Sequence, residues 1–250
     1  MTVAPSADRP RQARLLLFLR DLIVIVVIAA LASFLIKTFL VESFYIPSPS
    51  MENTLRGDPG HNDRILVDRL VPALIPLQRG DVVVFKDPGE WLQHDGAAAP
   101  VTRPAGPLQQ ILAAIDPFGA DNDDHLVKRV VGLAGDHVTC CNALGQMSVN
   151  GTPLLEPYVR LPGGTTAISR DDFDITVPNG RLWVMGDNRY DSADSRYNQD
   201  TPSKGYVPIK NVTGRAFVVS WPISRWSWLS NYPDTFDGIE AAQPVQHPKE

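Results

Sequence analysis

Cysteine is scarce in this 250-residue chain, which has two, the adjacent pair Cys140 and Cys141. Two neighbouring cysteines exclude a disulfide-rich scaffold and a four-cysteine zinc site. The chain also lacks an excess of positive charge, since 23 Lys and Arg stand against 28 Asp and Glu, for a net charge of −5. A chain of this charge has no global attraction for polyphosphate, so the composition predicts no nucleic-acid partner.

Long apolar runs are also lacking after residue 41, where no segment reaches 18 apolar residues. One membrane span is therefore predicted, at residues 22–41, where fifteen uncharged residues precede Lys37. Twenty residues at about 1.5 Å each match the thickness of a bilayer core, and Lys37 can extend its ammonium to the interface. A cleavable signal peptide is the alternative, because Ala30-Leu31-Ala32 has the pattern of a cleavage site. The apolar run continues beyond those residues, which favours an anchor.

The charges before the span predict its orientation. Residues 1–21 contain four arginines and two aspartates. The positive-inside rule then predicts a single-pass protein of the cell membrane, with a cytoplasmic N-terminal tail and everything after residue 41 extracytoplasmic. The lipid bilayer is accordingly an expected partner. Residues 221–229 hold three tryptophans beside an arginine, a composition typical of membrane interfaces but equally of a protein core.

Residues 42–229 are predicted to form one β-rich domain. Short β-branched runs bounded by Gly, Pro and Asn are frequent there, whereas helical periodicity is weak. The expected class is mostly β, with antiparallel sheets in a barrel-like domain behind the transmembrane helix. Residues 87–124 are predicted to be a surface insertion with a short helix at 107–115, and residues 230–250 a loose polar tail. The expected strands are 64–68, 81–85, 181–185 and 212–221, and Asn150-Gly151 predicts a hairpin with a type I′ turn.

A proline-rich stretch containing two serines follows the span. Pro47 and Pro49 flank Ser48, and Ser50 comes next. Proline restricts both itself and its predecessor to extended backbone, so this segment is predicted to be a stiff, exposed ribbon. Such a stretch is more typical of a linker than of an active site, because a serine hydroxyl is a poor nucleophile until a base takes its proton.

Two types of base are available to a serine. One is histidine, although no G-x-S-x-G pattern frames any serine, so a Ser50–His–Asp triad is the less favoured alternative. The other is Lys128, which lies beside Arg129 in an apolar run. Neighbours on a strand point to opposite faces, so we expect one of the two to face solvent and the other to point inward. Burial lowers the pKa of a lysine from about 10.4 and makes it a usable general base. The histidines are His61, His94, His125, His137 and His247.

A polar loop, residues 185–196, is dense in Gly, Asn and Asp, which is typical of a loop held by side-chain-to-backbone hydrogen bonds. Its acidic and arginine side chains are expected to form a buried ion network. Calcium binding is less favoured, because the spacing does not match an EF-hand loop. We therefore predict no metal and no cofactor. The charged residues are Asp187, Arg189, Asp191, Asp194 and Arg196.

Taken together, these segments resemble bacterial type I signal peptidases, which are membrane-bound serine proteases with a Ser/Lys dyad. The order is a single anchor, then P-S-x-S-M, R-G-D-V-V-V-F, K-R-V-V-G-L-A-G-D and G-D-N-R-x-x-S-x-D-S-R. The resemblance covers residues 43–196 and a closing strand at 214–222. The insertion at 87–124 and the C-terminal tail are not covered.

The resemblance implies roles for individual residues. Ser50 would be the nucleophile and Lys128 its general base, while the Ser48 hydroxyl and the Ser50 backbone N–H would form the oxyanion hole. Ser192 would orient the lysine. Tyr190-Asp191 departs from the commoner Asp-Asn, which makes the carry-over less direct at these two positions. The supporting ion network would comprise Arg129, Asp187, Asp194 and Arg196.

The resemblance also implies a substrate, the signal peptides of secretory preproteins. The peptide would lie extended between residues 43–48 and 125–128, adding backbone hydrogen bonds to both strands. Shallow pockets would select small side chains. The residues expected to line them are Ile46, Pro47, Met51 and Val127.

Two other functions compete with this interpretation. A self-cleaving repressor would use the same dyad but would have a DNA-binding N-terminus in place of a membrane span. A non-catalytic, membrane-anchored β-domain that binds exported proteins would leave Ser50 and Lys128 far apart. The two cysteines are expected to form a vicinal disulfide in an oxidising compartment, with two reduced thiols as the alternative.

Overall fold

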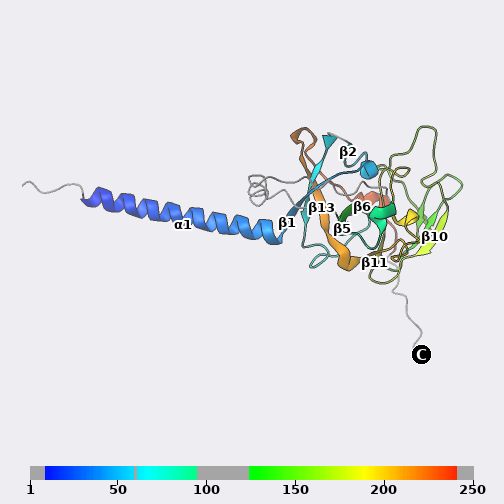
Figure 1. The fold of residues 1–250 in the computed structure, drawn as a ribbon, viewed down its shortest axis with the longest axis horizontal. Helices are drawn as coiled ribbons and strands as arrows, with labels where there is room; N and C mark the ends of the chain where they lie inside the picture. Colours follow the sequence, from blue (N-terminus) through cyan, green and yellow to red (C-terminus); the bar gives the residue numbers. More distant parts are fainter. Residues whose placement is uncertain (1–8, 59–60, 95–123, 241–250) are drawn as a thin grey trace, which may run out of the picture. The chain divides into compact units, whose positions relative to one another are not determined.

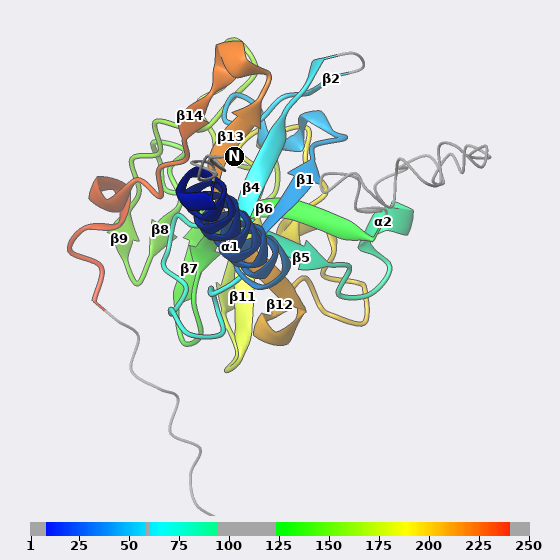
Figure 2. The ribbon, with the colours of Figure 1, turned by 90° about the vertical axis from the view of Figure 1, so that its left-hand side faces the viewer.

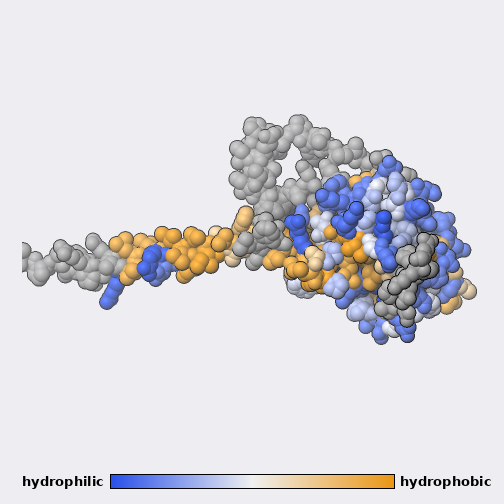
Figure 3. All heavy atoms as spheres, turned by 90° about the horizontal axis from the view of Figure 1, so that it is seen from below, coloured by the Kyte–Doolittle hydropathy of each residue, from blue (hydrophilic) through white to orange (hydrophobic). Residues whose placement is uncertain are grey.

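The computed structural model describes residues 9–58, 61–94 and 124–240, and it divides the chain into two units, Met1–Val41 and Glu42–Glu250. The first unit contains helix α1 (Arg9–Phe39), in which Leu16–Phe34 is long and apolar enough to cross a membrane. Figure 3 shows that the surface of α1 is mostly hydrophobic. Helix α1 ends at Phe39 and Val41 begins strand β1, so the helix stops two residues before the end of the predicted span.

The second unit is built on an eight-stranded sheet, seen from two sides in Figures 1 and 2. Its strand order is β1-β4-β13-β5-β6-β11-β12, and β14 pairs with β13. Strand β13 pairs antiparallel with β4 and with β5, and β6 pairs antiparallel with β5 and with β11. The strands are β1 (Val41–Tyr45), β4 (Arg64–Asp68), β5 (Val82–Lys86), β6 (His125–Gly132), β11 (Arg181–Met185), β12 (Val207–Pro208), β13 (Val212–Trp221) and β14 (Ser227–Trp228).

A four-stranded sheet, in the order β10-β7-β8-β9, and the β2–β3 hairpin complete the described strands. The expected class, mostly β with antiparallel sheets and one N-terminal apolar helix, is confirmed. The strands of these smaller sheets are β2 (Gly57–Asp58), β3 (His61–Asn62), β7 (His137–Cys140), β8 (Ser148–Val149), β9 (Thr152–Pro153) and β10 (Phe173–Thr176).

Buried apolar side chains form the cores that hold the sheets. In β4, Ile65 and Val67 alternate with partly exposed neighbours and pack in one cluster with Phe44, Ile46 and Met51. Because a strand presents alternate residues to one face, this pattern fixes which side of β4 faces the core. Ile46 precedes Ser48 in the sequence and Met51 follows it, so their packing in this cluster holds the segment around Ser48 in place.

The structure describes the predicted hairpin and both ends of the predicted insertion. Asn150 and Gly151 connect β8 to β9 with φ values of 51° and 81°, as the type I′ prediction requires. In the insertion, the short helix α2 (Trp91–His94) is described and the side chain of Trp91 is fully buried. The Asp87 N–H donates to the Asp124 carbonyl at 2.9 Å, which joins the two ends of the insertion. The helix expected at 107–115 lies outside the described residues.

The prediction of a loose tail from residue 230 is wrong for residues 230–240. The 3-10 helix η5 (Pro233–Phe236) lies in this segment, and the Thr235 hydroxyl donates to the Leu155 carbonyl at 2.9 Å. Ile239 is buried in the apolar cluster of the smaller sheet, together with Met147. The segment therefore contributes to the core, which its polar composition did not indicate. Residues 241–250 lie outside the described range.

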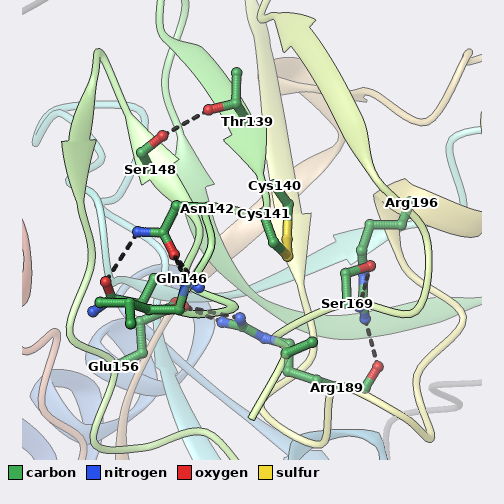
Figure 4. The surroundings of a disulfide bond; sticks show 12 residues. Thr139, Cys140, Cys141, Asn142, Gln146, Ser148, Glu156, Ser169, Arg189 and Arg196 are labelled. Atoms are coloured by element: carbon green, nitrogen blue, oxygen red, sulfur yellow. Dashed lines mark hydrogen bonds and ion pairs between the residues drawn. A yellow bond between two sulfur atoms is a disulfide. The ribbon is translucent and has the colours of Figure 1, made fainter.

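The two cysteines are joined by a vicinal disulfide, the form that the sequence favoured (Figure 4). Cys140 ends β7 and is buried in the cluster of the smaller sheet. Beside it, the hydroxyls of Thr139 and Ser148 lie 2.6 Å apart and link β7 to β8. The disulfide is thus part of the smaller sheet.

Candidate active site

Ser50 lies in a short 3-10 helix, η1 (Pro49–Met51), and is 5% exposed. The prediction of an exposed, extended ribbon is wrong here, because Met51 and Ile46 pack into the apolar cluster beside β4 and draw the segment inward. Two hydrogen bonds from Asn188 hold this turn in place. Its backbone N–H donates to the Ser50 carbonyl at 3.1 Å, and its side-chain amide donates to the Pro49 carbonyl at 3.2 Å.

Lys128 reaches Ser50 from β6. Its Nζ donates to the Ser50 Oγ at 2.7 Å, although the two residues are 78 positions apart in the sequence. The non-catalytic alternative required these side chains to be far apart, and they are in hydrogen-bond contact. Lys128 and Arg129 are both buried, with exposed fractions of 1% and 0%. The expectation that one of them faces solvent is wrong, because β6 lies between β5 and β11 and side chains cover both of its faces.

Ser48 is adjacent to this pair. Its backbone is extended, with φ −129° and ψ 152°, and its Oγ lies 3.1 Å from the Ser50 Oγ. The two serine hydroxyls and the lysine amine thus form a continuous chain of short polar contacts. Ser48 is partly exposed, whereas Ser50 and Lys128 are buried. The chain of contacts therefore leads from a solvent-accessible surface to a buried amine.

A groove of about 420 Å³ lies above these side chains. The segments 44–47 and 125–128 both contribute to its walls, so the two expected substrate strands do border one cavity. All four predicted pocket residues line it. Leu92 and Asp191 line it as well and were not predicted, because the insertion and the polar loop gave no sign of facing the serines. The lining residues include Ile46, Pro47, Ser48, Ser50, Met51, Leu92, His125, Val127, Lys128 and Asp191.

Arg129 points to the opposite face of β6 and anchors the polar loop. Its guanidinium makes two hydrogen bonds with the Asp187 carboxylate, at 2.8 and 2.7 Å, and both side chains are fully buried. It also donates to the Gly80 carbonyl at 2.6 Å and to the Ser230 carbonyl at 3.0 Å. The Tyr158 ring lies 4.1 Å from the guanidinium carbon. This bidentate, charge-assisted pair fixes the loop that carries Asn188 against β6.

Ser192, Asp194 and Arg196 form a second buried group at the other end of the loop. The Ser192 hydroxyl donates to Asp194 at 2.9 Å, and Arg196 donates twice to the same carboxylate, at 2.9 and 2.8 Å. Burial by itself would raise the pKa of Asp194, but the charge and hydrogen bonds of Arg196, the Gly186 N–H and the charge of Lys128 lower it below its ordinary value. Asp194 is therefore held as a carboxylate beside the lysine.

We expect this carboxylate to make the folded protein sensitive to acid. A group whose pKa is lowered on folding adds stability above its unfolded-state pKa of about 4, and that stability is lost as the pH falls through the lower folded-state pKa. Urea unfolding of the wild type and of Asp194→Asn between pH 7 and pH 3 measures the effect. The stability difference between the two proteins should shrink as the pH falls. A difference independent of pH would contradict the prediction.

Two features of the site were missed at the level of the sequence, the close approach at Gly186 and the partner of Arg189 in the expected ion network. Gly186 lies so close to Ser50 and Ser192 that a side chain at this position would clash with the Ser50 carbonyl and the Ser192 hydroxyl. Arg189 forms a fully buried ion pair with Glu156 at 2.6 Å (Figure 4). Burial alone would lower the pKa of Arg189, but Glu156 raises it above the ordinary value. Gly186 belongs to the G-D-N-R motif and could have been found there, whereas nothing in the sequence pairs Arg189 with Glu156.

Of the histidines that the structure describes, His125 is the one that lines the groove, where its ring lies 5.2 Å from the Phe44 ring. Its Nδ1 lies 2.7 Å from the Asp124 carboxylate. His137 is instead half-exposed on the smaller sheet and contacts Asp174. His247 lies outside the described range. Within residues 9–58, 61–94 and 124–240, no three His, Cys, Asp or Glu side chains are grouped so that they could hold a metal ion.

A serine hydroxyl held against a buried lysine amine, at the floor of a largely apolar groove, is the arrangement of serine hydrolases that use lysine in place of histidine. The model of the family described as "Signal peptidase, peptidase S26" matches residues 19–221. The chain belongs to this family.

Curated relatives are similar to the chain over most of its length. The "Probable signal peptidase I" of Mycobacterium leprae is 39% identical over 227 residues, which cover 83% of this chain and 78% of that protein. The "Signal peptidase I" of Mycobacterium tuberculosis is 38% identical over 235 residues, covering 89% and 79%. The "Signal peptidase I" of Pseudomonas aeruginosa is 32% identical over 238 residues, covering 79% and 71%.

Proposed function

We propose that this chain is a membrane-bound serine endopeptidase that removes signal peptides from exported preproteins, with Ser50 and Lys128 as its catalytic pair. The observation that carries the proposal is the 2.7 Å hydrogen bond from the Lys128 Nζ to the Ser50 Oγ at the floor of the groove. Family membership supports the reaction class, and the curated relatives are named for cleavage of signal peptides.

Lys128 acts as the general base in this mechanism. In its neutral form the amine accepts the Ser50 proton as the serine oxygen attacks the scissile carbonyl. The resulting ammonium then gives its proton to the leaving amine, and an acyl-enzyme ester on Ser50 remains. Water attacks this ester, with Lys128 again taking the proton, and releases the new carboxylate. Ser192 and Asp194 position the lysine from the neighbouring loop.

Ser48 and the Ser50 backbone N–H form the oxyanion hole. The Ser48 Oγ lies 3.1 Å from the Ser50 Oγ, so its hydroxyl can donate to an oxyanion that forms beside the nucleophile. Pro49 lacks a backbone N–H, but neither proposed donor comes from that residue. Donors that are fixed before the reaction stabilise the negative charge as it develops without reorganising.

The substrate lies extended along the groove and pairs with the backbone of residues 44–47 and 125–128. The buried side chains of Ile46 and Met51 line the groove beside Ser50, and their bulk favours small substrate side chains near the scissile bond. The anchor α1 places the enzyme in the membrane where preproteins emerge. Four arginines before the span favour a cytoplasmic N-terminus and an extracytoplasmic catalytic unit.

The test is cleavage of a secretory preprotein by the full chain in detergent, with the products identified by mass spectrometry. We expect a single cut after a small-x-small sequence. A matched preprotein with Phe in place of the small residue just before the cut should be cleaved about ten- to a hundredfold more slowly, because overpacking a filled pocket costs about 1–3 kcal/mol. Equal cleavage of both preproteins, or no cleavage of any, would contradict the proposal.

A further inference from the structure

A second, smaller pocket lies where β13 changes its partner. Arg215 of β13 is opposite Val83 of β5, whereas Val218 is opposite Trp228 of β14. Between these two pairings, a pocket of about 260 Å³ opens beside the strand. Its floor includes Asp81, and its walls include Arg215, Phe217 and Trp228. The proposed mechanism does not use this pocket, although Asp81 belongs to the R-G-D-V-V-V-F motif.

Asp81 brings an unpaired buried oxygen to the pocket. The residue is 1% exposed, and its Oδ2 accepts the Gln78 N–H at 2.8 Å. Its Oδ1 has no partner at hydrogen-bond distance and angle in the described part of the chain. Burial raises the pKa of Asp81, and the nearby Asn231 side chain, which also lines the pocket, lowers it only in part. The nearest cationic atom is Arg215 Nη1 at 3.7 Å, which is too far for a hydrogen bond. A buried carboxylate oxygen without a donor is unfavourable, so this atom is a site that an incoming N–H would satisfy.

Arg215 also lacks a short ion pair. Its side chain is 29% exposed, and its ion pairs with Asp81 and Asp68 are both 3.7 Å long. The Asp81 carboxylate and the N–H groups of Arg215 therefore lie in one pocket without a short contact between them. Next to them, the rings of Phe217 and Trp228 stack with their centroids 6.0 Å apart, and Trp228 is largely exposed. These rings give the pocket an apolar wall.

We propose that this pocket binds a small zwitterion whose primary ammonium and anionic group are two or three atoms apart. The ammonium donates to the Asp81 Oδ1, and the anionic group accepts from Arg215. A plain cation fits less well because Arg215 repels it, and a plain anion fits less well because Asp81 does. Aminoethyl phosphate has this chemistry both as a free molecule and as the headgroup of a phospholipid.

Isothermal titration calorimetry on the full chain in detergent tests the proposal, with O-phosphoethanolamine as the first probe. We expect saturable binding, and binding of phosphocholine that is at least about tenfold weaker, because methylation removes the N–H groups that Asp81 accepts. Dihexanoyl-phosphatidylethanolamine distinguishes the two sources. Tighter binding of this short lipid assigns the site to a headgroup, and equal or weaker binding assigns it to the free zwitterion; either result supports the site.

Variants connect binding to the named atoms. Asp81→Asn and Arg215→Gln should each weaken O-phosphoethanolamine binding by about tenfold or more, since each removes a charged partner. Asp68→Asn is the matched control, because Asp68 pairs with Arg215 outside the pocket lining, and its affinity should change by less than about twofold. Arg215 is partly exposed, so Arg215→Gln decides the question if Asp81→Asn does not fold. Absence of saturable binding, equal binding of phosphocholine or unchanged affinity in Arg215→Gln would overturn the proposal.

Discussion

Lys128→Met is expected to abolish preprotein cleavage, lowering kcat/KM by about a hundred- to ten-thousandfold. Methionine preserves most of the buried volume of lysine but has no amine to accept the Ser50 proton at 2.7 Å. Ser50→Ala should have at least as large an effect, because it removes the nucleophile itself. Groups that act as one unit are not additive, so the double variant should be no slower than Ser50→Ala. Cleavage kinetics with one preprotein at a fixed pH measure all three variants.

Two matched controls make this result specific. Ser227→Ala removes an exposed serine hydroxyl outside the groove and should leave the rate unchanged. His125→Ala removes the histidine that lines the groove and distinguishes the two candidate bases. Substantial cleavage by a folded Lys128→Met, together with its loss in His125→Ala, would transfer the role of base from lysine to histidine.

Asp187→Asn is expected to lower the free energy of unfolding by about 3–5 kcal/mol. Its carboxylate is fully buried against Arg129, and removal of one partner of a buried ion pair leaves the other charge uncompensated. The Gly80 and Ser230 carbonyls continue to accept from Arg129, which places the expected loss toward the lower end of that range. Urea or guanidinium unfolding at neutral pH measures it.

Glu42→Gln is the matched control for this ion-pair prediction. Glu42 pairs with Arg69 at 3.7 Å, and both side chains are partly exposed. Exposed pairs contribute about 0–1 kcal/mol, so this variant should unfold close to the wild type. A similar, small loss in both variants would show that the Arg129–Asp187 pair contributes no more than a surface contact.

Local pattern was enough to predict much of the fold. Turn chemistry at Asn150-Gly151 and apolar alternation in 64–68 identified a hairpin and a strand, because both signals depend on near neighbours in the sequence. The burial of Arg129 beside Lys128 could not be predicted in this way. It depends on β6 being an interior strand, and that position is set by pairings with β5 and β11 that no local pattern encodes.

The residues of the candidate site that belong to sequence motifs could be predicted. Ser50, Lys128 and Ser192 were named from an ordered set of motifs, and the structure brings Ser50 and Lys128 into contact. Leu92 and Glu156 were missed, because each reaches its place through tertiary contacts over long sequence separations. The packing of residues 230–240 was missed because a single buried side chain, Ile239, gives no periodic signal.

The strand order of the large sheet has a consequence for the timing of activity. The strands that precede and follow Ser50, β1 and β4, lie on one side of β13, and the strands β5 and β6 that position Lys128 lie on the other. Strand β13 (Val212–Trp221) follows all four of these strands in the sequence, so the continuous sheet that joins the two halves cannot form until β13 has been made. The proposed catalytic pair would therefore assemble only after β13 is complete, and a growing chain that has not yet reached this strand would be proteolytically silent.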